Sequence, residues 1–217
     1  MFSSIPLSNY FVFLSFLASI IAYKKPGIPS YLKLFPAFLL ITIIVEFISL
    51  YLWLHNITNF KLYNFFTAFE FSFYLFIFSK MITSARISKI IRYTIPAYVT
   101  LSVVNIFFFQ KDTFSSITYA LGCLLIVTCA VYYFFELFQY PKSIKLTTEP
   151  SFWISSGLLF YYCCSFPFLG LIGIVSTMPK ILLNNVKTIL DVINVLLYSL
   201  FTIAFLCKMQ IRKYMLQ

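Results

Sequence analysis

Two glutamates within strongly apolar segments are the residues of this sequence that are best placed to do chemistry. Glu70 lies in LYNFFTAFEFSFYLF, residues 62–76, and Glu46 lies in IIVEFISLY, residues 43–51. A carboxylate away from water needs a proton, a cation or hydrogen-bond donors, because an unpaired charge there is costly. Every Lys and Arg falls near the end of an apolar segment. We therefore expect at least one glutamate to be protonated at neutral pH unless water or a cation reaches it.

Polar side chains accompany both glutamates at helical spacing. Residues at i, i+4, i+7 and i+11 of a helix lie on one face. Around Glu70 this face carries Tyr63, Thr67, Glu70 and Tyr74, and around Glu46 it carries Thr42, Glu46, Ser49 and Trp53. The two segments are neighbours in the chain, so the spacing predicts two adjacent acidic helix faces.

Three later segments have polar faces as well. They carry Tyr98, Ser102 and Asn105, then Trp153, Ser156, Gly157 and Cys164, and finally Asp191, Asn194, Tyr198 and Thr202. Lipid cannot satisfy polar side chains, so these faces should turn toward the centre of a bundle. We expect the ligand-binding residues of one central pocket to be Glu46, Ser49, Tyr63, Asn64, Thr67, Glu70, Tyr74, Trp153, Asp191, Asn194 and Tyr198.

The elements that must position these residues are transmembrane helices. Of 217 residues, 61% are hydrophobic and 10% are charged, and the mean hydropathy of +0.93 is outside the usual range of soluble domains. A helix needs roughly 20 apolar residues to cross a bilayer. Seven segments fit, at residues 5–23, 34–55, 62–82, 93–110, 116–138, 151–174 and 188–207. We predict an all-α seven-helix membrane bundle that forms one domain over 1–217, with no soluble domain.

Basic residues predict the orientation of this bundle. Of the 16 Lys and Arg residues, all but Lys61, Lys111, Lys180 and Lys187 fall on one side of the predicted membrane. The positive-inside rule places that side in the cytoplasm, with the amino terminus outside and the carboxyl terminus inside. The net charge of +10 is explained by anionic lipid headgroups, so nucleic acid is not expected as a partner.

Several residue types point away from other chemistry. The five cysteines lie within or at the end of predicted helices, without the Cys or His spacing of a zinc site. The single histidine, His55, ends a predicted helix. We expect no metal and no cofactor.

An internal similarity links two parts of the chain. The segment KKPGIPSYLKLFPAF, residues 24–38, and the segment YPKSIKLTTEPSFW, residues 140–153, both place Pro and Lys before a P-x-F that opens a helix. Helices four apart have the same orientation, which fits a 3+1+3 parallel repeat. This plan resembles the SWEET sugar transporters and their PQ-loop relatives, although their Pro-Gln signature is missing.

A second resemblance covers nearly the whole chain. The combination of VEF at 45–47, LYNFFTAFEF at 62–71, EPSFW at 149–153 and NVLLY at 194–198 resembles a group of uncharacterised short seven-helix bacterial membrane proteins. Members are often encoded near sensor histidine kinases, which implies a sensory role and a bacterial cytoplasmic (inner) membrane location. The positions that correspond are Glu46, Asn64, Glu70, Trp153, Asn194 and Tyr198.

Four functions remain open at this point. A sensor would bind a small cationic or polar ligand in the acidic pocket and signal through a partner protein. A transporter would use the same acids for a proton or cation, with alternating access. An intramembrane enzyme would use the acid pair on a lipid, but the chain lacks motifs such as G-x-S-x-G and H-E-x-x-H. Finally, the polar faces could serve only as hydrogen-bonding contacts between helices.

Overall fold

Seven α-helices make up most of the described chain. The computed structural model describes residues 6–25, 27–139, 146–170 and 180–214, with side chains in the last range described for residues 185–207. The helices are α1 (Leu7–Tyr23), α2 (Phe35–Leu54), α3 (Phe60–Met81), α4 (Ala85–Val104), α5 (Ser116–Gln139), α6 (Pro150–Ser165) and α7 (Lys180–Tyr214). Within these ranges no strand is present, which confirms the all-α prediction.

Six of these helical segments are long and apolar enough to cross a membrane, so the chain is an integral membrane protein. They are the segments of α2 to α7, and α1 is a shorter apolar helix of 17 residues. At a rise of about 1.5 Å per residue, α1 spans roughly 26 Å, slightly less than the thickness of the hydrocarbon core.

Short π-helical segments extend two of the helices. Asn105–Phe109 continues α4, and Phe166–Gly170 continues α6. Pro167 lies in the second segment and has no backbone N–H to donate to the preceding turn.

Two helices start well before the positions that the sequence predicts, and α7 also ends later, at Tyr214 and not at residue 207. Helix α4 begins at Ala85 and not at residue 93, and α7 begins at Lys180 and not at residue 188. The residues before each predicted start include basic or amide side chains, so a search for apolar runs begins both helices too late. Residue 5, Lys142, Lys145 and residues 171–174, which the predicted spans and charge assignment included, lie outside the described residues.

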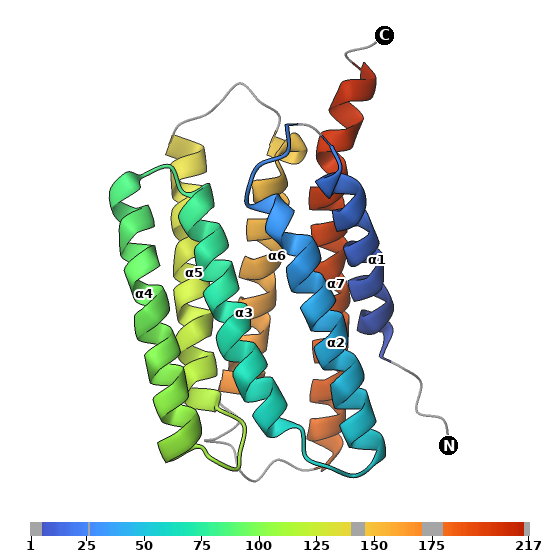
Figure 1. The fold of residues 1–217 in the computed structure, drawn as a ribbon, viewed down its shortest axis with the longest axis vertical. Coiled ribbons are helices and arrows are strands. Elements are labelled where there is room, and N and C mark those ends of the chain that lie inside the picture. Colours follow the sequence, from blue (N-terminus) through green and yellow to red (C-terminus); the bar gives the residue numbers. More distant parts are fainter. Residues whose placement is uncertain (1–5, 26, 140–145, 171–179, 215–217) are drawn as a thin grey trace.

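The helices form a ring of six with one helix outside it. The order around the ring is α1, α2, α3, α5, α6 and α7. Each helix contacts the next one, and α7 contacts α1. Helix α4 packs outside this ring against α3 and α5 (Figure 1). Helices α6 and α7 pack closely, whereas α2 and α3 touch at few points.

Aromatic side chains fill one half of the ring's centre. Phe35 and Phe38 of α2 meet Phe73 and Tyr74 of α3, with Phe38 and Phe73 stacked at 4.1 Å between ring centroids. Phe201 of α7 contacts both Phe35 and Tyr74. We call Phe35, Phe38, Phe73, Tyr74 and Phe201 the aromatic cluster. All but Phe73 are fully buried.

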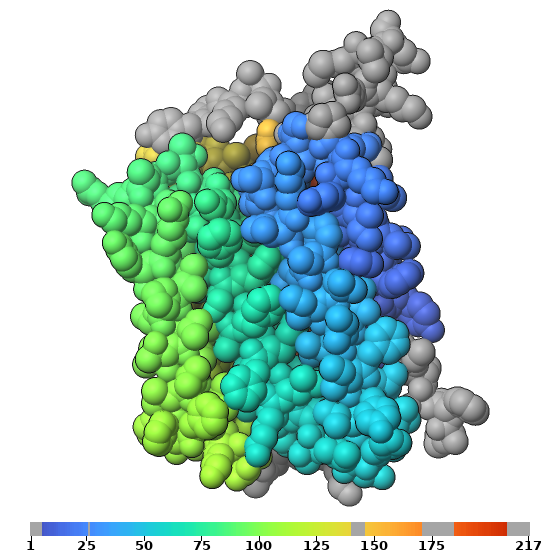
Figure 2. Space-filling view, viewed as in Figure 1, coloured from blue at the N-terminus to red at the C-terminus, as the bar shows by residue number. Residues whose placement is uncertain are grey.

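The outer surfaces of the helices are apolar. Figure 2 shows one face, formed by side chains of α4, α3, α2 and α1. Exposed side chains on these helices include Phe47, Phe65, Tyr93 and Leu101, each at least 49% exposed. A surface of this kind suits contact with lipid tails.

Candidate functional site

A cavity of about 950 Å³ lies in the other half of the ring's centre. Its walls come from the start of α1, the second half of α2, the first halves of α3 and α7, and single residues of α5 and α6. These parts lie at the end of the bundle where α2 turns into α3 (Figure 1). Trp53 and Lys187, which are exposed, line the cavity at this end, which we call its mouth.

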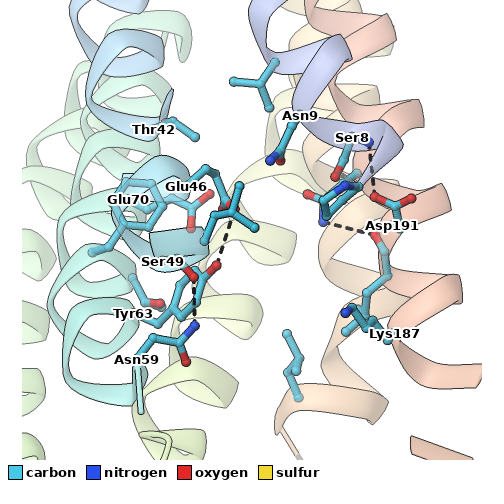
Figure 3. Close-up of a pocket in the computed structure, with 18 of the residues that line it drawn as sticks. Ser8, Asn9, Thr42, Glu46, Ser49, Asn59, Tyr63, Glu70, Lys187 and Asp191 are labelled. Atoms are coloured by element: carbon cyan, nitrogen blue, oxygen red, sulfur yellow. Dashed lines mark hydrogen bonds between the residues drawn. The ribbon is translucent and has the colours of Figure 1, made fainter. Parts of the chain in front are cut away.

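One wall of the cavity carries the glutamate pair. Glu46 and Glu70 both line it, and Figure 3 shows them next to each other on the side formed by α2 and α3. The Tyr63 hydroxyl donates a long hydrogen bond of 3.4 Å to Oε2 of Glu46. Below this pair, Asn59 donates to the Ser49 hydroxyl at 2.7 Å. Neither glutamate forms a salt bridge with a described residue.

The opposite wall carries Asp191. Its Oδ1 accepts a hydrogen bond of 3.1 Å from the backbone N–H of Ser8 (Figure 3). Ser8 is the second residue of α1, so its N–H has no partner within that helix. Helix α1 follows Pro6 and has no capping side chain of its own. Asp191 of α7 therefore caps α1 and holds the two helices together.

A single basic side chain lines the described part of the cavity. Lys187 lies at the mouth with its Nζ 5.6 Å from the centre of the Trp53 ring. Lys187 and Asp191 are four residues apart on α7, a spacing at which opposite charges attract. Lys187 lies one residue before the predicted start of this helix, and because α7 begins earlier, at Lys180, it adds a positive charge to the mouth of the cavity.

Tyrosines surround the inner end of the cavity. Tyr119, Tyr161 and Tyr198, from α5, α6 and α7, line it together with Thr67 and Glu70. Tyr119 is fixed by a hydrogen bond of 2.8 Å from its hydroxyl to Ser165. The inner end therefore combines carboxyl groups with several aromatic rings.

Two further tyrosines lie behind Glu70. The hydroxyls of Tyr74 and Tyr162 are close to the Glu70 carboxyl. Both hydroxyls are buried, and neither has a well-aligned hydrogen-bond partner among the described residues. Tyr74 and Tyr162 are also in ring contact at 6.1 Å. Tyr74 belongs to the aromatic cluster, so Glu70 stands at the boundary between the cavity and that cluster.

The structure brings together eight of the eleven predicted site residues. Those that line the cavity are Glu46, Ser49, Tyr63, Thr67, Glu70, Asp191, Asn194 and Tyr198. This placement agrees with the predicted inward orientation of the polar faces of α2, α3 and α7.

Three predicted site residues lie outside the cavity lining. Asn64 accepts from the Ser115 N–H and donates to the Thr113 carbonyl, which ties α3 to the turn before α5. Trp153 donates to the Thr147 carbonyl at 2.9 Å, at the opposite end of the bundle. Tyr74 is packed in the aromatic cluster behind Glu70. Helical spacing could not reveal this, because it gives a residue's face but not its neighbours.

Sequence reasoning missed several lining residues. Ser8 and Asn9 come from the start of α1, Asn59 from the α2–α3 turn, and Tyr119 and Tyr161 from helices whose polar residues were not grouped around them. Of these residues, Asn59 could have been found from the sequence, because it directly precedes α3 and is ten residues from Ser49, a predicted site residue.

The cavity offers little for a resident metal ion. Among the described residues, no group of three or more His, Cys, Asp or Glu side chains converges in a way that could hold one. The arrangement is suited to binding a small molecule or a proton between the two glutamates.

Comparison with protein-family models, with curated proteins and with solved structures finds no match to this chain.

Proposed function

We propose that this chain is the ligand-binding module of a membrane sensor. A small cationic or polar ligand enters the cavity at its mouth and binds at Glu46 and Glu70. The observation that carries the proposal is a cavity with two carboxyl groups that form no salt bridge with a described residue, next to a tightly packed aromatic cluster that joins α2, α3 and α7.

The aromatic cluster offers a route from the ligand to the rest of the bundle. Tyr74 contacts both Phe38 of α2 and Phe201 of α7. A ligand that draws Glu70 toward the cavity would change the surroundings of Tyr74 and the packing of these three helices. Such a shift requires that the ligand bind one packing more tightly than the other.

Helix α7 supports a role in signal output. It runs without interruption for 35 residues, from the cavity wall past the aromatic cluster (Figure 1). At about 1.5 Å per residue this is roughly 52 Å, longer than the bilayer core. Its far end is where a partner protein would detect a displacement.

The orientation in this proposal is amino terminus outside and carboxyl terminus inside, in a bacterial cytoplasmic membrane. In the structure, the α1–α2 and α3–α4 turns and the end of α7 lie at one end of the bundle (Figure 1). The first two carry Lys24, Lys25, Lys80 and Arg86, which supports a cytoplasmic location for this end. The cavity mouth then faces the outside.

The two tryptophans allow a direct test of ligand binding. Trp53 lines the cavity mouth, whereas Trp153 lies at the other end. In lipid nanodiscs, a Trp153→Phe variant reports from Trp53 alone and a Trp53→Phe variant serves as control. We expect methylammonium or a monovalent metal cation to change the fluorescence of the first variant only. No change with any of Na⁺, K⁺, Ca²⁺, methylammonium or benzylammonium would contradict the proposal.

A transporter is the second candidate, and the order of helix contacts favours it. In a 3+1+3 repeat, α1, α2 and α3 correspond to α5, α6 and α7. The contact of α3 with α5 then corresponds to the contact of α7 with α1, and the structure has both. Within the halves, the contact of α1 with α2 corresponds to that of α5 with α6, whereas α2 and α3 pack much less closely than α6 and α7. This order supports the 3+1+3 repeat, with α4 as the linker. Saturable uptake of labelled methylammonium into proteoliposomes would favour the transporter, and binding without uptake would favour the sensor.

A further inference from the structure

We infer that the ligand of this cavity is an organic ammonium compound, with its ammonium group at Glu46 and Glu70 and its apolar part against the surrounding aromatic rings. The inference rests on the proposed function and names the chemical class of the ligand.

The distribution of charge favours a cation at the inner end. Glu46 has one long hydrogen bond from Tyr63, and Glu70 has no salt bridge with a described residue. Asp191 is engaged by the N–H of Ser8, and Lys187 lies over Trp53 one helical turn from Asp191. The charges of Asp191 and Lys187 therefore largely offset each other, and the glutamate pair sets the field of the inner end.

The aromatic lining favours an organic cation over a hydrated ion. Seven aromatic side chains line the described part of the cavity, those of Trp53, Tyr63, Phe66, Phe114, Tyr119, Tyr161 and Tyr198. The faces of such rings attract weakly hydrated cations, and sites for ammonium compounds use this property. Apolar substituents on the nitrogen would also be removed from water against these rings.

The size and donor set of the cavity argue against a bare metal ion. A metal such as Ca²⁺ needs six to eight oxygen ligands at short range. The described residues contain no converging group of three or more candidate metal-ligating side chains. A volume of about 950 Å³ is much larger than a dehydrated ion and falls within the range of pockets for small organic ligands.

Two buried hydroxyls, those of Tyr74 and Tyr162, lie close to the Glu70 carboxyl on the side away from the cavity. Tyr74 and Tyr162 are fully buried, and their hydroxyls have no well-aligned partner among the described residues. Each such group costs free energy until it finds a hydrogen bond. Glu70 therefore joins the ammonium site to two buried tyrosine hydroxyls, so a bound ammonium group and these hydroxyls share one carboxyl group.

Paired probes test the inference in the Trp153→Phe variant in nanodiscs. Benzylammonium and benzyl alcohol have similar shapes, but only the first carries a charge. We expect benzylammonium to change Trp53 fluorescence saturably and to bind on the order of tenfold more tightly than benzyl alcohol, as a charge-assisted hydrogen bond to a carboxylate allows. Na⁺, K⁺ and Ca²⁺ should compete weakly.

Variants of the lining separate charge from ring contributions. Glu70→Gln and Glu46→Gln should each weaken benzylammonium binding by on the order of tenfold and leave benzyl alcohol binding unchanged. Tyr161→Leu should weaken ammonium binding by about threefold or more, whereas Tyr161→Phe keeps the ring and should bind normally. A circular-dichroism melt of each variant shows that it is folded.

The outcomes distinguish this inference from the function on which it rests. Equal binding of benzylammonium and benzyl alcohol would overturn the inference. Tighter binding of a metal cation than of methylammonium and benzylammonium would overturn it as well. Either result leaves a ligand-binding cavity in place. The absence of any response, in Trp53 fluorescence and in the unfolding temperature, would overturn both.

Discussion

Glu46 and Glu70 differ from the acidic residues that have structural partners in this protein. Asp191 caps α1 through Ser8, Glu136 accepts the N–H groups of Thr83 and Ser84 before α4, and Asp112 pairs with Lys61 at 3.8 Å. Among the described residues, Glu46 has the long bond from Tyr63 of α3, and Glu70 has the hydroxyls of Tyr74 and Tyr162 close to it. Neither carboxyl caps a helix or forms a salt bridge with a described residue, so both are available to a ligand.

This difference predicts that the two glutamates contribute little to folding. Replacing either Glu46 or Glu70 by Gln should change the unfolding free energy by less than about 0.5 kcal/mol, the usual range for sites without a structural role. Gln keeps the shape and can hydrogen-bond with Tyr63 or Tyr74. Thermal unfolding in nanodiscs measures the effect. A large loss of stability would mean that the pair serves as a contact between helices.

Asp191 should behave in the opposite way. Asp191→Ala removes the acceptor for the Ser8 N–H and should destabilise the protein by about 1 kcal/mol, as the loss of a helix cap does. Asp191→Asn keeps an acceptor oxygen and should lose less. Hydrogen exchange at the first turn of α1 is the direct measurement, and unchanged exchange in Asp191→Ala would refute the cap.

At the residue scale, the sequence predicted which side of a helix a polar residue lies on better than it predicted the hydrogen-bond partner of that residue. Helical spacing correctly turned Glu46, Thr67, Glu70 and Asn194 toward one cavity. It could not show that Asp191 binds a backbone N–H of α1, because that contact joins residues 183 positions apart. The same holds for Glu136, whose two backbone donors lie 53 and 52 positions away in the chain.

At the scale of helices, Glu136 fixes where α4 begins. Its two oxygens accept from the Thr83 and Ser84 N–H groups at 2.8 and 2.9 Å. Glu136→Ala should therefore destabilise the start of α4 by about 1 to 2 kcal/mol, whereas Glu136→Gln should keep one bond and lose less. Hydrogen exchange of residues 83–88 measures this. Equal protection in Glu136→Ala and the parent protein would contradict it.

The contact between α3 and α5 depends on a glycine. A Cβ added at Gly122 would lie 2.7 Å from the Phe71 ring, which is fully buried and held by Tyr98, Tyr119 and Tyr162. Gly122→Ala should therefore destabilise the bundle by about 1 to 3 kcal/mol through overpacking.

Gly157→Ala is the matched control for that substitution. Its nearest contact would be the flexible end of Leu197 at 3.2 Å, so the loss of stability should be smaller. Thermal unfolding of both variants in nanodiscs compares them, and equal stability of Gly122→Ala and the parent would contradict the packing argument.

Apolar runs predicted the existence of the helices but not all of their ends. The observed α2, α3 and α5 start and finish within two residues of the predicted 34–55, 62–82 and 116–138. Helix α4 starts eight residues earlier than predicted. The prediction missed its first turns because they carry Arg86, Lys89 and Arg92 and are not an apolar run. Its start depends on Glu136 of α5, which is remote in the chain and invisible to local pattern.

At the scale of the whole molecule, the account requires the cavity mouth to face outward. A fluorescent protein fused after the carboxyl terminus should then fold and fluoresce, whereas alkaline phosphatase fused at the same position should stay inactive, because it needs export. Substituting Asn56, in the exposed turn between α2 and α3, by Cys in a cysteine-free background should give labelling by an impermeant reagent from outside. The reverse pattern would contradict the orientation.

The central claim is that the carboxyl groups of Glu46 and Glu70 bind a cationic ligand. Its most direct test is the infrared difference spectrum of the nanodisc-embedded protein on addition of benzylammonium. The account predicts changes in carboxyl bands that disappear in Glu46→Gln and Glu70→Gln and persist in Glu136→Gln, whose carboxyl lies outside the cavity. A spectrum in which no carboxyl band changes, or in which the changes survive both cavity substitutions, would contradict it.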